Sequence, residues 1–235
     1  MNWRVPRMWE GGEVWIIGGG PSMPKQFGIP KEVIQRVVSG VSTPAVYSPY
    51  MKEIHDKHVI GINVSFMIGP WMDMAFFGDG SFFLRYKHQI AAFPGLKVSC
   101  DPKTGHYDWV KTLERDPNHG KGISQNPRMV AWNHNSGAAA ISVAVNAGAK
   151  RVLLLGFDMQ LAKDAQQHWH DMYHILVRDR HNGKPPKSLP FDLQLLGFPV
   201  IAHDAKQLGV EVLLVDCGKD SAIDCLRKVE LKDVL

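Results

Sequence analysis

Residues 136–158, SGAAAISVAVNAGAKRVLLLGFD, give the clearest indication of the fold class. Its first part, Ser136–Ala147, is rich in small residues and stops before Gly148, which is typical of a helix with ordinary start and stop signals. Its second part, Arg151–Leu155, is a nearly continuous apolar run that ends at Gly156. Such a run is typical of a strand buried on both faces of a parallel sheet. The short joint between the two parts predicts a helix that leads directly into a parallel strand.

Apolar runs of similar length recur along the chain and are predicted to be further strands. They are Glu13–Ile17, Val59–Ser65, Asp73–Phe77, Leu96–Ser99, Arg128–Trp132 and Glu211–Val215. Helices are expected over Lys31–Val38 and over Phe191–Leu208, the second broken near Pro199. The alternation predicts an α/β fold with a doubly wound, mostly parallel sheet that carries helices on both faces. We expect a single domain over residues 1–235, with an irregular, lid-like insertion at about residues 161–190.

The composition is that of an ordinary globular protein. Hydrophobic residues make up 45% and charged residues 21% of the 235 residues, which excludes wholesale disorder. The formal net charge of +4 permits an anionic ligand without demanding nucleic acid. Neither a signal peptide nor a membrane span is visible, and the three cysteines lack metal-ligand spacing. These features favour a reduced, cytoplasmic protein.

Glycine and small polar residues follow the ends of the predicted strands. Because ligands of open parallel sheets bind outside the carboxyl ends of the strands, we expect these turns to meet at one edge. They are Gly18–Ser22, Asn63–Ser65, Gly78–Ser81 and Gly156–Asp158, joined by Asn135–Gly137 at the start of the alanine-rich helix. The amides of a helix N-terminus favour anions, so the set predicts a nucleotide or phosphate cradle. The turn GGGPS completes neither a P-loop nor the dinucleotide glycine fingerprint.

The motifs GGGPS, GIN, FGD, NSG and LGFD occur in this order at residues 18–22, 61–63, 77–79, 135–137 and 155–158. The set resembles the bacterial sialyltransferases. It is equally similar to the related DUF115 proteins, which include flagellin-modifying glycosyltransferase candidates and the archaeal 6-hydroxymethylpterin diphosphokinase, and similar chains occur in phage genomes. The resemblance covers about residues 13–225 as scattered short motifs, of which SG…A…A…G…LLGFD is the most specific.

The resemblance implies a Rossmann-type fold of the sialyltransferase kind and, for a phage-type member, a place in the host cytoplasm. In the sialyltransferases the matching turns hold a CMP donor. Carried over by motif, the residues around the nucleotide would be Gly19, Gly20, Ser22, Asn63, Asp79, Ser136, Gly137, Gly156, Phe157 and Asp158. Met159 and Gln160 stand where the family carries its first donor-contacting tyrosine, so the resemblance does not extend to sialic acid as the transferred sugar.

The segment HWHDMYH, residues 168–174, carries the candidate catalytic residues. The family has a histidine base in this region, and the resemblance implies this role for one of the three histidines. We choose His170, which lies centrally beside Asp171, with His168 and His174 as the alternatives. A neutral imidazole can take a proton from an acceptor hydroxyl while a nucleotide leaves. The same histidines with Asp171 could instead bind a divalent metal or serve as structural partners of the backbone, and their spacing leaves these alternatives open. No metal ligand is assigned.

The leading interpretation is a glycosyltransferase-like enzyme with a nucleotide-sugar donor of CMP or UDP type. Its acceptor is unknown; a phage or cell-surface glycan or a modified nucleic acid would fit. One alternative is a diphosphokinase that acts on a pterin-like alcohol with ATP and Mg²⁺, in which Asp79 and Asp158 would hold the metal. Another is a non-catalytic nucleotide-binding module. No membrane partner is expected, and the sequence does not specify an oligomeric state.

Overall fold

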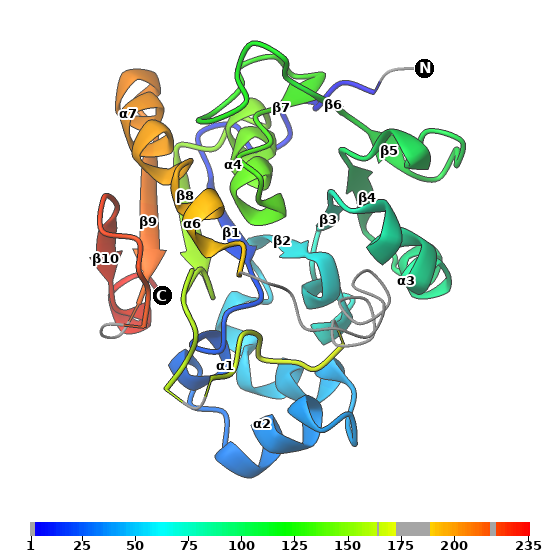
Figure 1. Ribbon diagram of the computed structural model, residues 1–235, viewed down its shortest axis with the longest axis vertical. Coiled ribbons are helices and arrows are strands. Elements are labelled where there is room, and N and C mark those ends of the chain that lie inside the picture. The colour runs from blue at the N-terminus through cyan, green and yellow to red at the C-terminus, as the bar shows by residue number, and fades with distance from the viewer. Residues whose placement is uncertain (1–2, 164, 173–188, 217–219) are drawn as a thin grey trace.

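The computed structural model describes residues 3–163, 165–172, 189–216 and 220–235 (Figure 1). Its centre is an eight-stranded sheet in which each pair of neighbouring strands is parallel. In spatial order the strands are β10 (Arg227–Val229), β9 (Glu211–Val215), β8 (Arg151–Leu155), β1 (Glu13–Ile17), β2 (His58–Ile62), β3 (Met74–Phe77), β4 (Leu96–Ser99) and β5 (Lys111–Thr112). The short strands β6 (Glu114–Arg115) and β7 (Met129–Val130) pair with each other in a separate sheet.

The sheet is doubly wound around β1. The chain proceeds from β1 through β2, β3, β4 and β5 on one side, then crosses to β8 on the other side and continues to β9 and β10. This reversal creates a topological switch point between β1 and β8, which is where open α/β sheets bind their ligands. The predicted α/β fold with a doubly wound parallel sheet is confirmed.

Helices cover both faces of the sheet and separate two hydrophobic cores (Figure 1). On one face lie α4 (Ser136–Asn146) and α7 (Phe198–Leu208); on the other lie α1 (Met23–Gln26), α2 (Lys31–Val38) and α3 (Gly80–Ala92). Successive residues of a strand point to opposite faces, so Ile16 packs in the first core and Trp15 in the second. Both are fully buried, which explains why β1 reads as a continuous apolar run.

Several boundaries differ from the sequence-based prediction. The second strand ends at Ile62 because Asn63 adopts a positive φ of 51° and begins a 3-10 helix, Asn63–Ile68. The strand expected at Arg128–Trp132 is reduced to β7 and lies outside the main sheet. Helix α3, missed by the prediction, begins at once after the glycine turn because the Asp79 side chain caps it by accepting from the Ser81 amide.

The remaining helix prediction is close to the structure. The expected Phe191–Leu208 helix is two helices, α6 (Phe191–Leu195) and α7, separated at Leu196 and Gly197. Pro199 lies in the first turn of α7, where its missing N–H removes no helical hydrogen bond. Most of the predicted insertion at 161–190 lies outside the described residues.

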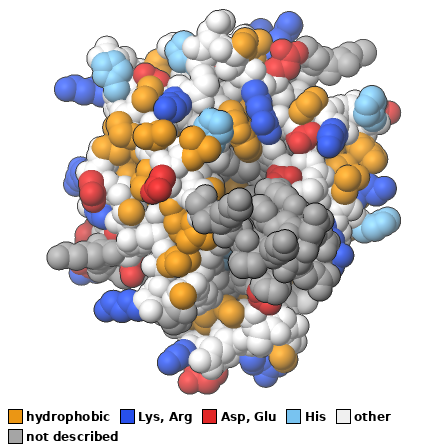
Figure 2. Space-filling model, in the orientation of Figure 1, with side chains coloured by type: hydrophobic (Ala, Val, Ile, Leu, Met, Phe, Trp, Pro, Cys, Tyr) orange, Lys and Arg blue, Asp and Glu red, His pale blue; other side chains and the backbone are white. Residues whose placement is uncertain are grey.

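The surface is mixed in charge. Figure 2 shows basic and acidic side chains interspersed among the coloured atoms of one face, in keeping with a net charge of +4. Within the described part of the chain, no helix combines the length and the apolar character needed to cross a membrane.

Candidate functional site

The turns that follow β1 and β8 interlock at the switch point. The Gly18 amide donates to the Leu155 carbonyl and the Gly20 amide to the Gly156 carbonyl, both at 2.8 Å. A β-carbon on Gly18 would lie 2.7 Å from the Gly156 oxygen, and one on Gly20 would lie 2.6 Å from it. The close approach of the two turns therefore requires glycine at both positions, independently of any ligand.

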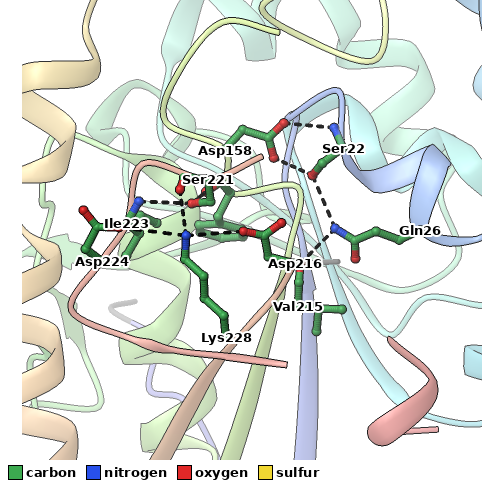
Figure 3. A network of polar contacts seen from close by, with 10 residues as sticks. Ser22, Gln26, Asp158, Val215, Asp216, Ser221, Ile223, Asp224 and Lys228 are labelled. Atoms are coloured by element: carbon green, nitrogen blue, oxygen red, sulfur yellow. Dashed lines mark hydrogen bonds and ion pairs between the residues drawn. The ribbon is translucent and has the colours of Figure 1, made fainter. Parts of the chain in front are cut away.

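Ser22 and Asp158 fasten the same two turns by side-chain contacts (Figure 3). The Ser22 amide donates to Oδ2 of Asp158 at 2.9 Å, and the Ser22 hydroxyl donates to Oδ1 at 2.6 Å. Burial raises the pKa of Asp158 to about 6, although the hydrogen bonds from Ser22 act in the opposite direction. Both oxygens of the Asp158 carboxyl group therefore accept hydrogen bonds from Ser22.

The network continues from this pair toward β9 and β10 (Figure 3). Gln26 of α1 donates through Nε2 to the Val215 carbonyl at the end of β9, at 2.8 Å. Ser221 donates through Oγ to the Phe157 carbonyl at 2.7 Å, and Lys228 Nζ lies 3.4 Å from Oδ2 of the buried Asp216. Sequence reasoning missed these partners, because they are separated by up to 189 residues and no local pattern marks them.

Phe157 and Gly137 have a structural explanation that the sequence did not reveal. The Phe157 side chain is only 2% exposed and packs edge-on against Phe198, with ring centroids 6.3 Å apart. A β-carbon on Gly137 would lie 2.7 Å from Cζ of Phe157. Gly137 therefore makes room for a core aromatic ring, and Phe157 can offer a ligand only its backbone.

The start of α4 is capped by Asn135 and not by Ser136. Oδ1 of Asn135 accepts from the amides of Gly137 at 2.8 Å and Ala138 at 3.2 Å. These two donors, which the sequence suggested for an anion, are occupied within the protein. The side chain of Asn63 is different. Its buried Oδ1 has no hydrogen-bond partner among the residues described, and its backbone is held at positive φ.

Trp169 ties the histidine segment to the glycine turn. Its indole is fully buried, and Nε1 donates to the Gly18 carbonyl at 2.9 Å, while its amide donates to the Gly19 carbonyl at 3.0 Å. Two tyrosines outside the segment support it further, since Tyr86 Oη donates to the Met172 carbonyl at 2.8 Å and Tyr47 Oη to the Trp169 carbonyl at 3.4 Å. Trp169 is thus a structural anchor and not an exposed stacking platform.

The two described histidines of this segment lie directly beside the glycine turn. Their rings stack, with centroids 5.3 Å apart and planes inclined by 5°, and a β-carbon on Gly19 would be 2.9 Å from Nδ1 of His168. Burial lowers the pKa of His168 to about 4 and lowers that of His170 well below its ordinary value. Nδ1 of His170 accepts from the Met172 amide at 3.2 Å, which places the proton of the neutral ring on Nε2. His174 lies outside the described residues.

The structure therefore brings the predicted residues of β1, β8 and the histidine segment into mutual contact. Asn63 follows β2, the neighbour of β1, and Asp79 follows β3, one strand further along the same edge. The Asp79 carboxylate accepts from the amide and hydroxyl of Ser81. In the described ranges no group of three or more His, Cys, Asp or Glu side chains could hold a metal ion.

Solved structures with the same architecture include two glycosyl-transferring proteins. The sialyltransferase CstII from Campylobacter jejuni, in complex with the substrate analogue CMP-3FNeuAc, matches with a TM-score of 0.51 and 13% identity over 93% of this chain and 86% of that one. The MAf glycosyltransferase from Magnetospirillum magneticum AMB-1 matches with a TM-score of 0.58 and 13% identity over 99% of this chain. The fold is sialyltransferase-like.

The chain covers only 35% of the MAf protein. No known family of sequences matches it, and no curated protein is significantly similar in sequence. The likeness is therefore one of fold. The relationship to DUF115 proteins and the phage origin stay predictions.

Proposed function

We propose that the protein is a glycosyltransferase-like enzyme that binds a nucleotide-activated sugar at the edge between β1 and β8. The observation that carries the proposal is the anchoring of a histidine segment directly on the glycine turn at the switch point, through Trp169. α/β sheets bind nucleotides at this place, and a base beside the nucleotide is what sugar transfer to a hydroxyl needs. The sialyltransferase CstII, which shares the fold, was solved with a CMP-sugar analogue.

Among the residues assigned to the nucleotide, Asn63 is the one whose buried side-chain oxygen lacks a hydrogen-bond partner within the described part of the chain. A buried amide oxygen without a partner costs free energy, and a hydroxyl or amino group of a nucleoside would supply the missing donor. The floor beside it would consist of Gly19, Gly20 and Ser22 together with Gly156 and the backbone of Phe157 and Asp158. Ser136, Gly137 and Asp79 would border it through the start of α4 and the end of β3.

We assign the proton-accepting role to the histidine segment, with His168 ahead of His170. His168 is partly exposed, whereas His170 is 4% exposed and its Nδ1 is already engaged by Met172. As the acceptor oxygen bonds to the sugar carbon and the bond from that carbon to the nucleotide breaks, the neutral imidazole takes the hydroxyl proton. The lowered pKa of His168 keeps its ring neutral at physiological pH.

Calorimetric titration with CMP, UMP, UDP and ATP, each with and without Mg²⁺, tests the donor site. Saturable binding of a pyrimidine nucleotide is expected, weakened about tenfold or more in Asn63→Leu, because a buried polar contact is lost. Asn118→Leu, at an exposed loop position, is the matched control. Mg²⁺-dependent binding of ATP alone would favour the diphosphokinase, and no nucleotide binding at all would refute the proposal.

Release of nucleotide from the donor identified in this way tests the base. His168→Ala should lower turnover by about 10²-fold or more with little change in nucleotide affinity. The exposed His88→Ala serves as control, and His170→Ala is measured alongside. Full turnover in both segment variants would show that these histidines are structural. Binding without any turnover would support the non-catalytic module instead.

A further inference from the structure

A cavity of about 690 Å³ opens at the amino-terminal edge of the sheet. Its walls come from the segment before β1, the segment before β3 and the starts of β4 and β5. The five residues of β1 alone span about 16 Å, so this cavity is separated by the length of the sheet from the turns that follow β1 and β8. None of the residues assigned to the nucleotide lines it.

Two lysines line the cavity from adjacent strands. Lys97 of β4 and Lys111 of β5 are both half-buried. Because Lys111 is in register with Val98, the residue after Lys97, the two side chains leave the sheet on opposite faces, and both line the cavity at the sheet edge. Within the described residues neither ammonium has a carboxylate in ion-pair distance. A partly desolvated positive charge is stabilised by water or by an anion, so the cavity favours a ligand with negative charge.

The carboxylate of the cavity wall does not neutralise these lysines. Oδ2 of Asp73 accepts from the Val59 amide at 2.8 Å and lies 3.8 Å from Nδ1 of His58. It is therefore directed to the start of β2. The cavity keeps an excess of positive charge from Lys97 and Lys111.

Three indole rings complete the wall, and each is fixed by a neighbour. Trp9 stacks on His58 at 5.4 Å, and Trp71 stacks on His55 at 4.3 Å and donates through Nε1 to Ser48. Trp109 packs against Phe83 and Tyr107 and is 36% exposed. An indole that is held in place and partly exposed offers a flat apolar surface to a sugar ring or an aromatic ring at little cost in ordering.

We propose that this cavity is a second binding site, for a small organic anion that carries a flat apolar face. The apolar face lies on Trp109, and the anionic group lies against Lys97 and Lys111. An acidic sugar and an aromatic phosphate share this chemistry. The site is independent of the nucleotide site, so each can be tested without the other.

Calorimetric titration with glucuronate and with phenyl phosphate, each against its neutral counterpart glucose or phenol, tests the proposal and distinguishes the two sources. At least one anion should bind, with an affinity that falls as salt is added. The double variant Lys97→Gln/Lys111→Gln should bind the anion about tenfold or more weakly, since charge-assisted contacts are removed. The control Lys103→Gln/Lys121→Gln removes the same charge from exposed positions outside the cavity and should leave the affinity unchanged.

Trp109→Leu should lower the affinity for the same anion, because the indole face is lost while an apolar side chain remains. Both single lysine variants are measured as well, so that poor folding of the double variant cannot remove the test. Equal affinity in the wild type and the lysine variants, or equal affinity for the anion and its neutral counterpart, would overturn the proposal. Failure of both anions to bind at millimolar concentration would overturn it too.

Discussion

Asp158, in the turn after β8, and His168, in the segment beside the glycine turn, are both shifted toward their neutral forms. Burial raises the pKa of the carboxyl group to about 6 and lowers the pKa of the imidazole to about 4. The same physical cause acts in both cases, since a low-dielectric surrounding disfavours the charged form of an acid and of a base alike. Their effects on stability against pH therefore have opposite signs.

For Asp158, stability is fully present below the ordinary pKa near 4 and is lost as the pH rises through about 6. The isosteric Asp158→Asn removes this titration and keeps an acceptor for the Ser22 amide. Urea unfolding should show that the wild type loses on the order of 2 kcal/mol relative to the variant between pH 4 and pH 7. Asp158→Ala leaves Ser22 without its partner and should be less stable at every pH. A constant difference between the wild type and Asp158→Asn would contradict the raised pKa.

For His168, stability depends on pH with the opposite sign. The folded state binds its proton only near pH 4, while the unfolded chain binds it near pH 6.5, so stability is lost as the pH falls through this window. His168→Gln should reduce the acid-induced decrease in the unfolding midpoint, whereas His88→Gln, at an exposed position, should not. Nuclear magnetic resonance titration of the His168 ring checks the cause directly. A pKa of His168 near the ordinary 6.5 would contradict the explanation by burial.

Helix α4 packs closely against the turn after β8. The helix is rich in small residues, and Gly137–Ala144 are all buried. A β-carbon on Gly137 would lie 2.7 Å from Cζ of Phe157, so no side chain fits between them. The glycine at this helix start is therefore a packing requirement of the fold.

Gly137→Ala should destabilise the protein by about 1–3 kcal/mol, because the added β-carbon forces Phe157 from its place in the core. Phe157→Leu in the same chain should restore part of this loss, and a double-mutant cycle of chemical unfolding measures the coupling. Gly120→Ala is the matched control, since a β-carbon there meets no atom within 4 Å. Additive effects of the two substitutions would contradict the contact.

At the scale of the whole molecule, one parallel sheet joins both halves of the chain through the pairing of β1 with β8. The register runs from Glu13 opposite Arg151 to Ile17 opposite Leu155, and both strands are buried after their first residue. A break in this pairing would separate the cores on both faces. We therefore expect the chain to unfold as a single cooperative unit.

Leu154→Ala tests this cooperativity, because Leu154 is fully buried in the central strand β8. It should cost about 2–5 kcal/mol, and circular dichroism and tryptophan fluorescence should report the same shifted midpoint. Leu193→Ala, at a position that is 47% exposed, should change the stability by less than about 0.5 kcal/mol. Separate transitions for the two signals would argue for two independent domains.

Much of the fold follows from local patterns. Residues 13–17, 96–99, 151–155 and 211–215 form strands with the expected bounds, and Lys31–Val38 forms the expected helix. The central strands are nearly continuous apolar runs, which a single sequence displays. Strands β5 and β10 have two and three residues, too few to form such a run, and α3 begins at Gly80, inside the glycine turn.

The apolar runs of the sequence show which turns end the strands, and parallel pairing places those turns at one edge of the sheet. The role of each residue in these turns depends on contacts that form only in the folded chain. In the folded chain Asp158 pairs with Ser22, the Phe157 ring packs in the core, and Asn63 Oδ1 has no partner among the described residues. Strand and helix formation depend on neighbours within a few positions, whereas burial and hydrogen-bond satisfaction also depend on groups far away in the sequence, such as Ser22 and Asp158, which are 136 residues apart.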